Sequence, residues 1–388
     1  MEYEDIFYRH TRLLKIFGVS LTAQEPGWLS KIYFAVVVLA LAMNSCFQMV
    51  GILLPGVSPV DRAKGLVSFF VFSVGGFKIY VLQTKRKELL YLFEKLDLPG
   101  ARASTYMMRK VRAIHKAYTG CLVLMVFVWI AYPVLVKEVE LPVPYWWPSG
   151  VASKQRKMVL FCFVTACLAW ACGAHESSDT LFLLFAGQIC RRFDSINDSL
   201  VTLGRDNIEA DYRRSTVKPD SMGLAIVKDA DKTRDEILLK ECIREHVDVI
   251  KLVRVLDEVL DIIFFVQVIQ STLVCVMTFF AVFKLGDPLD SIPKFLPILI
   301  ATYLQFYMYC WMGEEISFHS DDLHKAVYCS QWYMCNRRVM SSIVVMETFT
   351  KTHFKLDAGH LFRIGLRTFV LVLEQSFSYF MVLRAITK

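Results

Sequence analysis

The densest group of ionisable and hydroxyl side chains in the sequence is the run His175-Glu176-Ser177-Ser178-Asp179. An imidazole beside two carboxyl groups could exchange protons as an acid–base pair or a proton relay. The run lies late in an apolar stretch, where polar side chains are costly and mark either a function or bonds to neighbouring helices. We favour bonds to neighbouring helices or contact with cytosolic water, because no second group of catalytic residues accompanies the run.

Other arrangements that carry chemistry are missing from the sequence. It contains no H-E-x-x-H or C-x-x-C metal pair, no glycine-rich phosphate loop and no G-x-S-x-G nucleophile turn. We therefore predict a protein that is not an enzyme and that binds no metal or other cofactor. With 55% hydrophobic and 13% aromatic residues, the composition is that of a polytopic membrane protein.

Seven apolar stretches are long enough to cross a bilayer, which takes about 20 helical residues. They are Ser30–Leu53, Gly65–Leu82, Ala117–Val136, Met158–Cys190, Asp261–Phe283, Phe295–Gly313 and Phe362–Ala385. If Lys31 is counted with the N-terminus and Arg384 with the C-terminal tail, 31 of the 44 Lys and Arg residues fall on the N-terminus and the second, fourth and sixth connections. Ten fall on the first, third and fifth connections and the C-terminal tail. The fold class is thus all-α with seven transmembrane helices, a cytoplasmic N-terminus and an extracellular C-terminus. The opposite orientation is that of a G-protein-coupled receptor, so that class is excluded.

The segments outside the membrane also have helical patterns. Near the N-terminus, Ile6, Phe7, Leu13, Leu14 and Phe17 form the apolar side of an amphipathic helix, which is typical of a membrane surface. Helical periodicity also extends over Thr233–Leu260 and Ser317–Thr350, which predicts a cytoplasmic layer of helices. Just before the first of these, Arg205–Lys232 mixes charge with proline and glycine and is expected to be mobile. The net charge of +7 reflects these cytoplasmic segments rather than a nucleic-acid partner.

Aromatic side chains gather in the expected outer halves of several spans. Such residues either face lipid and pack between helices, or line a small apolar ligand pocket, and periodicity alone leaves both interpretations open. The set, called the aromatic set below, is Phe69, Phe72, Phe77, Trp129, Tyr132, Phe163, Trp170, Tyr303 and Tyr307, together with the hydroxyl residue Ser73.

The closing stretch, Leu361–Lys388, has a polar middle in an otherwise apolar span. On a helix, one stripe of this stretch is polar at mid-depth and apolar toward the C-terminus. It consists of Thr368, Leu371, Gln375, Ser378, Val382 and Ile386. Such a stripe either bonds to neighbours inside a helix bundle or lines a pore with an apolar constriction at its outer end. The direction in which Glu374 points is open.

Several runs resemble the insect odorant receptors of the tuning, odour-binding class. The strongest lie in the last seventy residues: Ala326-Val-Tyr-Cys-Ser-Gln-Trp332-Tyr, Leu356-Asp-Ala-Gly359, Leu366-Arg-Thr-Phe-Val-Leu-Val-Leu and Ser376-Phe-Ser-Tyr-Phe-Met-Val-Leu-Arg384. Weaker matches are Leu141-Pro142, Trp147-Pro148, Asp179-Thr-Leu-Phe-Leu-Leu and Phe193-Asp-Ser-Ile-Asn.

This resemblance implies a subunit of a ligand-gated, non-selective cation channel in the plasma membrane of a sensory neuron dendrite. Four subunits, including a common co-receptor, would surround a pore, with no G protein required. The expected division is residues 1–313 for the amphipathic helix, six spans and the outer-half pocket, 314–361 for the cytoplasmic anchor, and 362–388 for the pore helix. A gustatory-type receptor channel that works without the co-receptor is the alternative.

The resemblance also assigns roles to the two sets of residues above. Val382 and Ile386 match the hydrophobic gate at the outer end of the pore helix, with Ser378 and Gln375 deeper. The aromatic set, without Phe77 and Phe163, supplies the candidate residues for binding a small, volatile, hydrophobic odorant.

Overall fold

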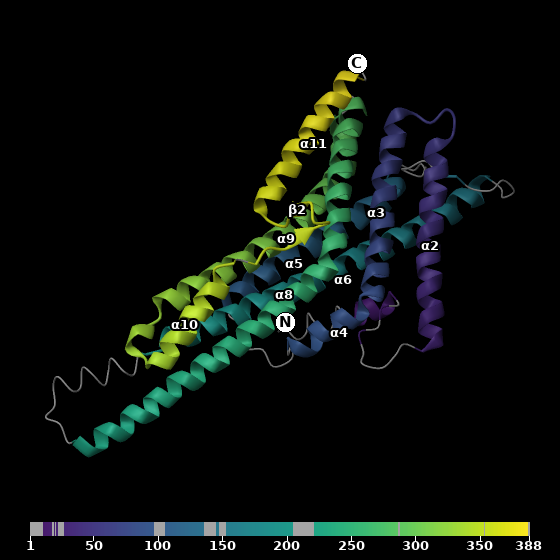
Figure 1. Cartoon of the computed structure of the whole chain (residues 1–388). Coiled ribbons are helices and arrows are strands. Elements are labelled where there is room, and N and C mark those ends of the chain that lie inside the picture. Colours follow the sequence, from purple (N-terminus) through teal and green to yellow (C-terminus); the bar gives the residue numbers. More distant parts are fainter. Residues whose placement is uncertain are drawn as a thin grey trace.

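The computed structural model describes residues 11–17, 19, 21, 27–96, 105–135, 145–146, 153–204, 221–285, 288–352 and 354–386. The chain is built from helices, with one pair of two-residue strands (Figure 1), and the predicted all-α class is confirmed. The long helices are α2 (Trp28–Leu53), α3 (Pro59–Thr84), α5 (Thr105–Leu135), α6 (Ser153–Thr202), α8 (Ser221–Leu285) and α9 (Pro288–Cys329). The shorter elements are α4 (Arg86–Lys95), η1 (Trp332–Met334), α10 (Arg337–Thr350), β1 (Asp357–Ala358), β2 (Phe362–Arg363) and α11 (Leu366–Ile386).

Six stretches within the described helices are long and apolar enough to cross a membrane, and they lie in α2, α3, α5, α6, α8 and α11. The predicted span 295–313 lies in α9, outside these six stretches. The chain is thus a multi-pass membrane protein, and its orientation stays a prediction from the charge asymmetry.

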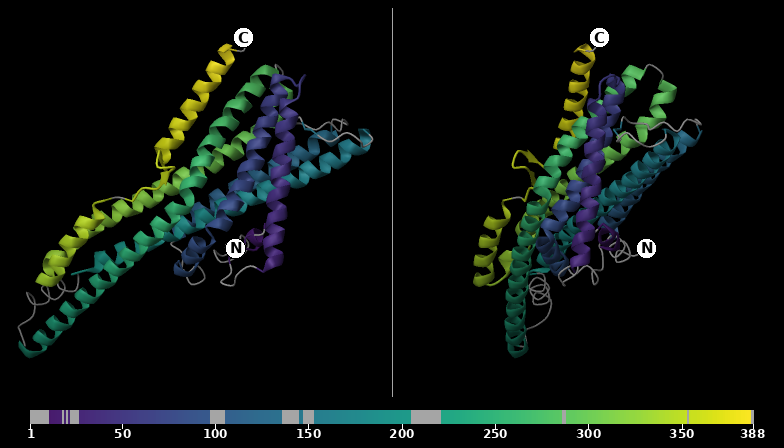
Figure 2. Two further views of the ribbon diagram at one scale, coloured as in Figure 1. Left: turned by 45° about the vertical axis from the view of Figure 1, so that its right-hand side comes forward. Right: turned by 90° about the vertical axis from the view of Figure 1, so that its right-hand side faces the viewer.

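Three helices, α6, α8 and α9, are too long to lie wholly within a bilayer. With 65 residues, α8 is about 98 Å long at a rise of about 1.5 Å per residue, against a hydrocarbon core of about 30 Å. The N-terminal half of α8, the C-terminal half of α9 and α10 form an arm at the end of the molecule opposite α11 (Figures 1 and 2). This arm contains the segments in which helical periodicity predicted a cytoplasmic layer. The expected boundary at residue 313 falls inside α9, and the division into three parts stays a prediction.

The centre of the fold is α6, which contacts α3, α5, α8 and α9. Every residue from 174 to 190 is buried. Polar side chains in that stretch depend on hydrogen-bond partners within the protein, because an unpaired buried polar group costs about 1–3 kcal/mol.

The N-terminal segment packs on the bundle rather than extending away from it. Residues 11–16 are helical, and Leu14 and Phe17 are buried. Phe17 meets the ring of Trp170 edge to face, with 5.0 Å between the ring centroids. Ile6 and Phe7, which were predicted to share the apolar side of this helix, lie outside the described residues.

Two predicted boundaries are wrong. The closing helix begins at Leu366 rather than near Phe362, because the chain first turns back on itself: β2 pairs antiparallel with β1, and Gly359 and His360 adopt positive φ angles of 58° and 54° between them. The second boundary is the start of α8. This helix begins at Ser221, inside the segment Arg205–Lys232 that was expected to be mobile. Pro219 is the last residue there that blocks a helix, and residues 205–220 lie outside the described part.

Candidate functional site

A buried ion pair joins α3 to α6. Lys78 Nζ lies 2.6 Å from Asp179 Oδ1, and the two side chains are 0% and 1% exposed. The Asp179 carboxylate also accepts hydrogen bonds from the Tyr118 hydroxyl at 2.8 Å, the Tyr309 hydroxyl at 2.5 Å and the Gln305 amide at 2.5 Å. These extra donors are needed because desolvating two charges costs more than their attraction alone returns. The pair therefore ties α3, α5, α6 and α9 together.

Hydrogen bonds extend this network from Asp179 through His175. His175 Nε2 lies 3.0 Å from the Val71 carbonyl oxygen, which can only accept, so this nitrogen carries the proton. His175 Nδ1 must then accept, and it does so from Gln305 Nε2 at 3.0 Å. Gln305 Oε1 in turn accepts from Gln267 Nε2 of α8 at 3.0 Å. His175 and Gln305 thus have their polar atoms engaged within the protein.

The run from His175 to Asp179 is structural. Besides the bonds of His175 and Asp179, Glu176 Oε1 accepts from the Thr119 hydroxyl of α5 at 3.2 Å. The interpretation that these residues bond to neighbouring helices is confirmed for His175, Glu176 and Asp179, whereas the two serines donate to backbone carbonyls of α6 itself. No group of three His, Cys, Asp or Glu residues within the described ranges is placed to hold a metal ion.

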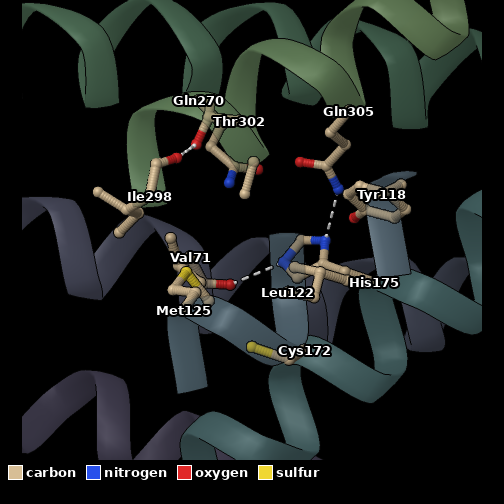
Figure 3. Close-up of a pocket in the computed structure, with 11 residues that line it drawn as sticks. Val71, Tyr118, Leu122, Met125, Cys172, His175, Gln270, Ile298, Thr302 and Gln305 are labelled. Carbon is tan, nitrogen blue, oxygen red and sulfur yellow. Dashed lines mark hydrogen bonds between the residues drawn. The ribbon is translucent and has the colours of Figure 1, made fainter. Parts of the chain in front are cut away.

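A small cavity adjoins the network (Figure 3). It lies among five helices: α3, α5, α6, α8 and α9. Its volume is about 20 Å³, roughly what one water molecule fills. The lining residues are Val71, Tyr118, Leu122, Met125, Cys172, His175, Gln270, Ile298, Ala301, Thr302 and Gln305. A largely apolar cavity with a few converging polar groups is the usual form of a small-molecule site.

The eight residues predicted to bind ligand are not among those that line this cavity, and their role stays a prediction. Phe72 is buried in the core, and Ser73 donates to the Ser45 hydroxyl at 3.0 Å. Trp170 contacts Phe17, whereas Phe69, Trp129, Tyr303 and Tyr307 are half-buried. The side chain of Tyr132 lies outside the described part.

The residues that do line the cavity carry a signal that the aromatic search passed over. Gln267, Gln270 and Gln305 stand in apolar stretches of α8 and α9, and all three are at most 3% exposed. Polar side chains inside a membrane span are expensive and usually mark a site. A search for such amides would have selected two of the lining residues from the sequence.

The closing helix α11 contacts α8 and α9 along one face only. Its buried residues are Thr368, Val372 and Ser376. The four predicted pore residues lie on the face away from these contacts: Gln375 and Ser378 are exposed, and Val382 and Ile386 are 55% and 77% exposed. Glu374 is exposed as well. Thr368, at the start of the stripe, is buried within the subunit, whereas the four predicted pore residues are left uncovered, and their role in a pore and gate stays a prediction.

Three contacts fasten the start of α11 to α9. Glu314 Oε2 accepts from the Leu366 backbone N–H at 3.2 Å, which satisfies one of the free donors at the helix start. Gly313 lies against Ile364 so closely that an added Cβ would be 2.4 Å from the Ile364 carbonyl oxygen. The Phe369 ring lies 5.7 Å from the Tyr307 ring, centroid to centroid. These contacts hold the start of α11 against α9.

Comparison with known proteins gives consistent results at three levels. The family model described as 7tm odorant receptor matches residues 60–377. Odorant receptor Or1 of Anopheles gambiae is 25% identical over 348 residues, which cover 79% of this chain and 80% of that protein. Odorant receptor 23a of Drosophila melanogaster is 23% identical over 319 residues, which cover 78% and 76% of the two chains.

The fold also matches a solved structure over nearly its whole length. The insect olfactory receptor OR5 from Machilis hrabei, in complex with eugenol, superimposes with a TM-score of 0.82. The two sequences are 14% identical, and the match covers 99% of this chain and 98% of that one. A second structure of OR5 from Machilis hrabei gives the same TM-score of 0.82.

Proposed function

We propose, since this chain belongs to the 7tm odorant receptor family, that it is the odorant-binding subunit of a heteromeric, ligand-gated, non-selective cation channel. It is a multi-pass protein of the plasma membrane and a receptor rather than an enzyme. The finer proposal is that a small volatile ligand binds between the helices and opens a pore lined by α11. Its partners are co-receptor subunits in a tetramer in the membrane of a sensory neuron dendrite, without a G protein.

The observation that carries the ligand-binding part is the cavity among α3, α5, α6, α8 and α9. A volume of about 20 Å³ is too small for a volatile molecule of six or more heavy atoms. Binding therefore has to spread the lining side chains, and the ligand favours whichever state of the bundle has the wider cavity. A ligand shifts a conformational balance only through such a difference in affinity. OR5, which has the same fold, was solved with the small phenol eugenol.

The pore part of the proposal depends on the exposed face of α11. A large apolar side chain that a subunit leaves uncovered usually meets another protein or a membrane. In a ring of four subunits, Val382 and Ile386 would form an apolar constriction that holds back hydrated ions by dewetting. Gln375 and Ser378 would supply polar atoms deeper in the same pore.

Coupling between the two parts runs through α9. Gln305 lies at the cavity, whereas Phe306 and Tyr307, the next two residues, contact Phe369 of α11 with 5.7 Å between ring centroids. Successive residues on a helix point about 100° apart, so these side chains leave α9 on different faces. A ligand that displaces α9 on the cavity side therefore displaces the start of α11 on the other.

The test is to record currents from cells that express this chain with an odorant co-receptor, with the co-receptor alone, and by itself. Odorant-evoked cation current only when both are present supports the proposal. Current from this chain alone would instead support the gustatory-type alternative. Ala301→Phe, which fills the cavity, should abolish the response while surface expression persists; an unchanged dose–response would place the ligand elsewhere.

A further inference from the structure

We infer that the cavity selects ligands with a hydroxyl group, which donates a hydrogen bond to Gln270 Oε1. The inference deepens the proposed function and rests on it for the identity of the site. The ligand class is a neutral alcohol or phenol with an apolar remainder.

Gln270 presents a buried acceptor that the protein does not satisfy. The side chain is 2% exposed and reaches the cavity from α8 (Figure 3). Its Oε1 has no hydrogen-bond partner within the part of the chain that the structure describes. A buried acceptor left without a donor costs about 1–3 kcal/mol, so a cavity with such an atom favours an occupant that donates to it.

The other polar side chains of the cavity are already engaged. His175 and Gln305 bond to each other and to their neighbours, and the Tyr118 hydroxyl donates to Asp179. Thr302 Oγ1 donates to the Ile298 carbonyl oxygen at 2.8 Å. Each of these groups has a hydrogen-bond partner without a ligand. Gln270 is therefore the residue that recognises the polar atom of the ligand.

The rest of the lining disfavours charged ligands. Its remaining members are mostly apolar, including Val71, Leu122, Met125 and Ala301. The nearby cation, Lys78, is paired with Asp179 and does not line the cavity. A charged amine or carboxylate would therefore lose its hydration without gaining a counter-ion. A neutral hydroxyl donates one hydrogen bond at a much smaller cost of desolvation.

The experiment compares isomers that differ only in whether they can donate. Benzyl alcohol is paired with anisole, and 1-hexanol with methyl pentyl ether, so size and atom composition are equal within each pair. Both members are applied to the channel formed by the full chain with the co-receptor, and to the purified full chain in a thermal-shift measurement of binding. We expect the alcohol to act at a concentration roughly 2- to 10-fold lower than its ether, because only the alcohol can donate a hydrogen bond to the unpaired acceptor.

Two variants then test whether the difference in potency between alcohol and ether arises from the Gln270 amide. Gln270→Met keeps the length of the side chain without the acceptor, and it should reduce the potency of both alcohols to that of the ethers. Thr272→Val removes a hydroxyl from the same helix outside the cavity and should preserve the preference. The comparison of isomers on the unchanged protein needs no variant to fold.

The outcomes separate the inference from the proposed function. Equal potency of alcohol and ether on a working channel would overturn the inference and leave the proposed function standing. Preferential binding of alcohols without any current would support the inference and contradict the channel. Failure of every alcohol to bind the purified chain would overturn the ligand class.

Discussion

The buried pair Lys78–Asp179 predicts a large and unequal response to mutation. Lys78→Met leaves a carboxylate buried among three donors without a counter-charge, and the expected loss in the free energy of unfolding is about 3–5 kcal/mol. Asp179→Leu should cost more, since it leaves the Lys78 ammonium unpaired and also removes the acceptor for those three donors. Against a total stability of about 5–15 kcal/mol, either loss should sharply reduce surface expression.

The double variant Lys78→Met/Asp179→Leu isolates the charge interaction. It removes both charges but still leaves three donors without their acceptor, so recovery should be partial. We expect it to be more stable than the two single losses added together by about 2–3 kcal/mol. Lys64→Met is the matched control: Lys64 also pairs with an aspartate on α3, at 3.0 Å, but the Asp61 side chain is 49% exposed. Its loss should be about 0–1 kcal/mol.

Thermal unfolding of the purified receptors, followed by tryptophan fluorescence, gives the order of stability, and surface labelling of cells gives expression. The predicted order is wild type and Lys64→Met highest, Lys78→Met next and Asp179→Leu lowest, with the double variant above its additive value. Strictly additive single losses, or a Lys64→Met loss as large as that of Lys78→Met, would refute the argument that burial makes this pair expensive to break.

Three further predictions concern the closing helix. Gly313→Ala should reduce odorant-evoked current, because its Cβ would meet the Ile364 carbonyl oxygen; Gly120→Ala, with no atom within 4 Å of its added Cβ, should leave that current unchanged. Phe369→Ala should lower the maximal current without altering the thermal shift on ligand binding, and an equal loss of binding would place Phe369 at the cavity rather than in the coupling. Val382→Ala should raise basal current in cells with the co-receptor; unchanged basal current and ion selectivity would contradict its place in the gate.

Apolar segments and charge asymmetry were sufficient to predict the class of fold. A stretch such as Ser30–Leu53 appears as α2 (Trp28–Leu53) with nearly the same bounds, because the lack of water in a bilayer forces an apolar span to be helical. The length of α8 was only partly predictable. Beyond the membrane its periodicity indicates a helix, but only Pro219 hints at the start at Ser221.

The cavity could not be predicted from residue types alone. Aromatic residues such as Phe72 and Trp170 suit a pocket and a core equally well, and packing placed these two in contact with other side chains. Tyr118 and Gln305 reach the same space from helices far apart in sequence, and no local pattern encodes that meeting. Buried amides were the better guide, because an unpaired amide in an apolar span has few inexpensive solutions.

The size of the cavity also determines how efficiently a ligand can act on the gate. To move a two-state balance from 1:99 to 99:1, a ligand must bind the favoured state about 5.5 kcal/mol more tightly. At about 0.8 kcal/mol per buried methylene, a six-carbon chain provides about 5 kcal/mol, and a hydrogen bond to Gln270 adds about 1 kcal/mol. That total suffices only if almost none of it is gained in the closed state. A cavity of about 20 Å³ is too small to hold such a chain, so the proposed gating requires the chain to bind only where the lining side chains have spread apart.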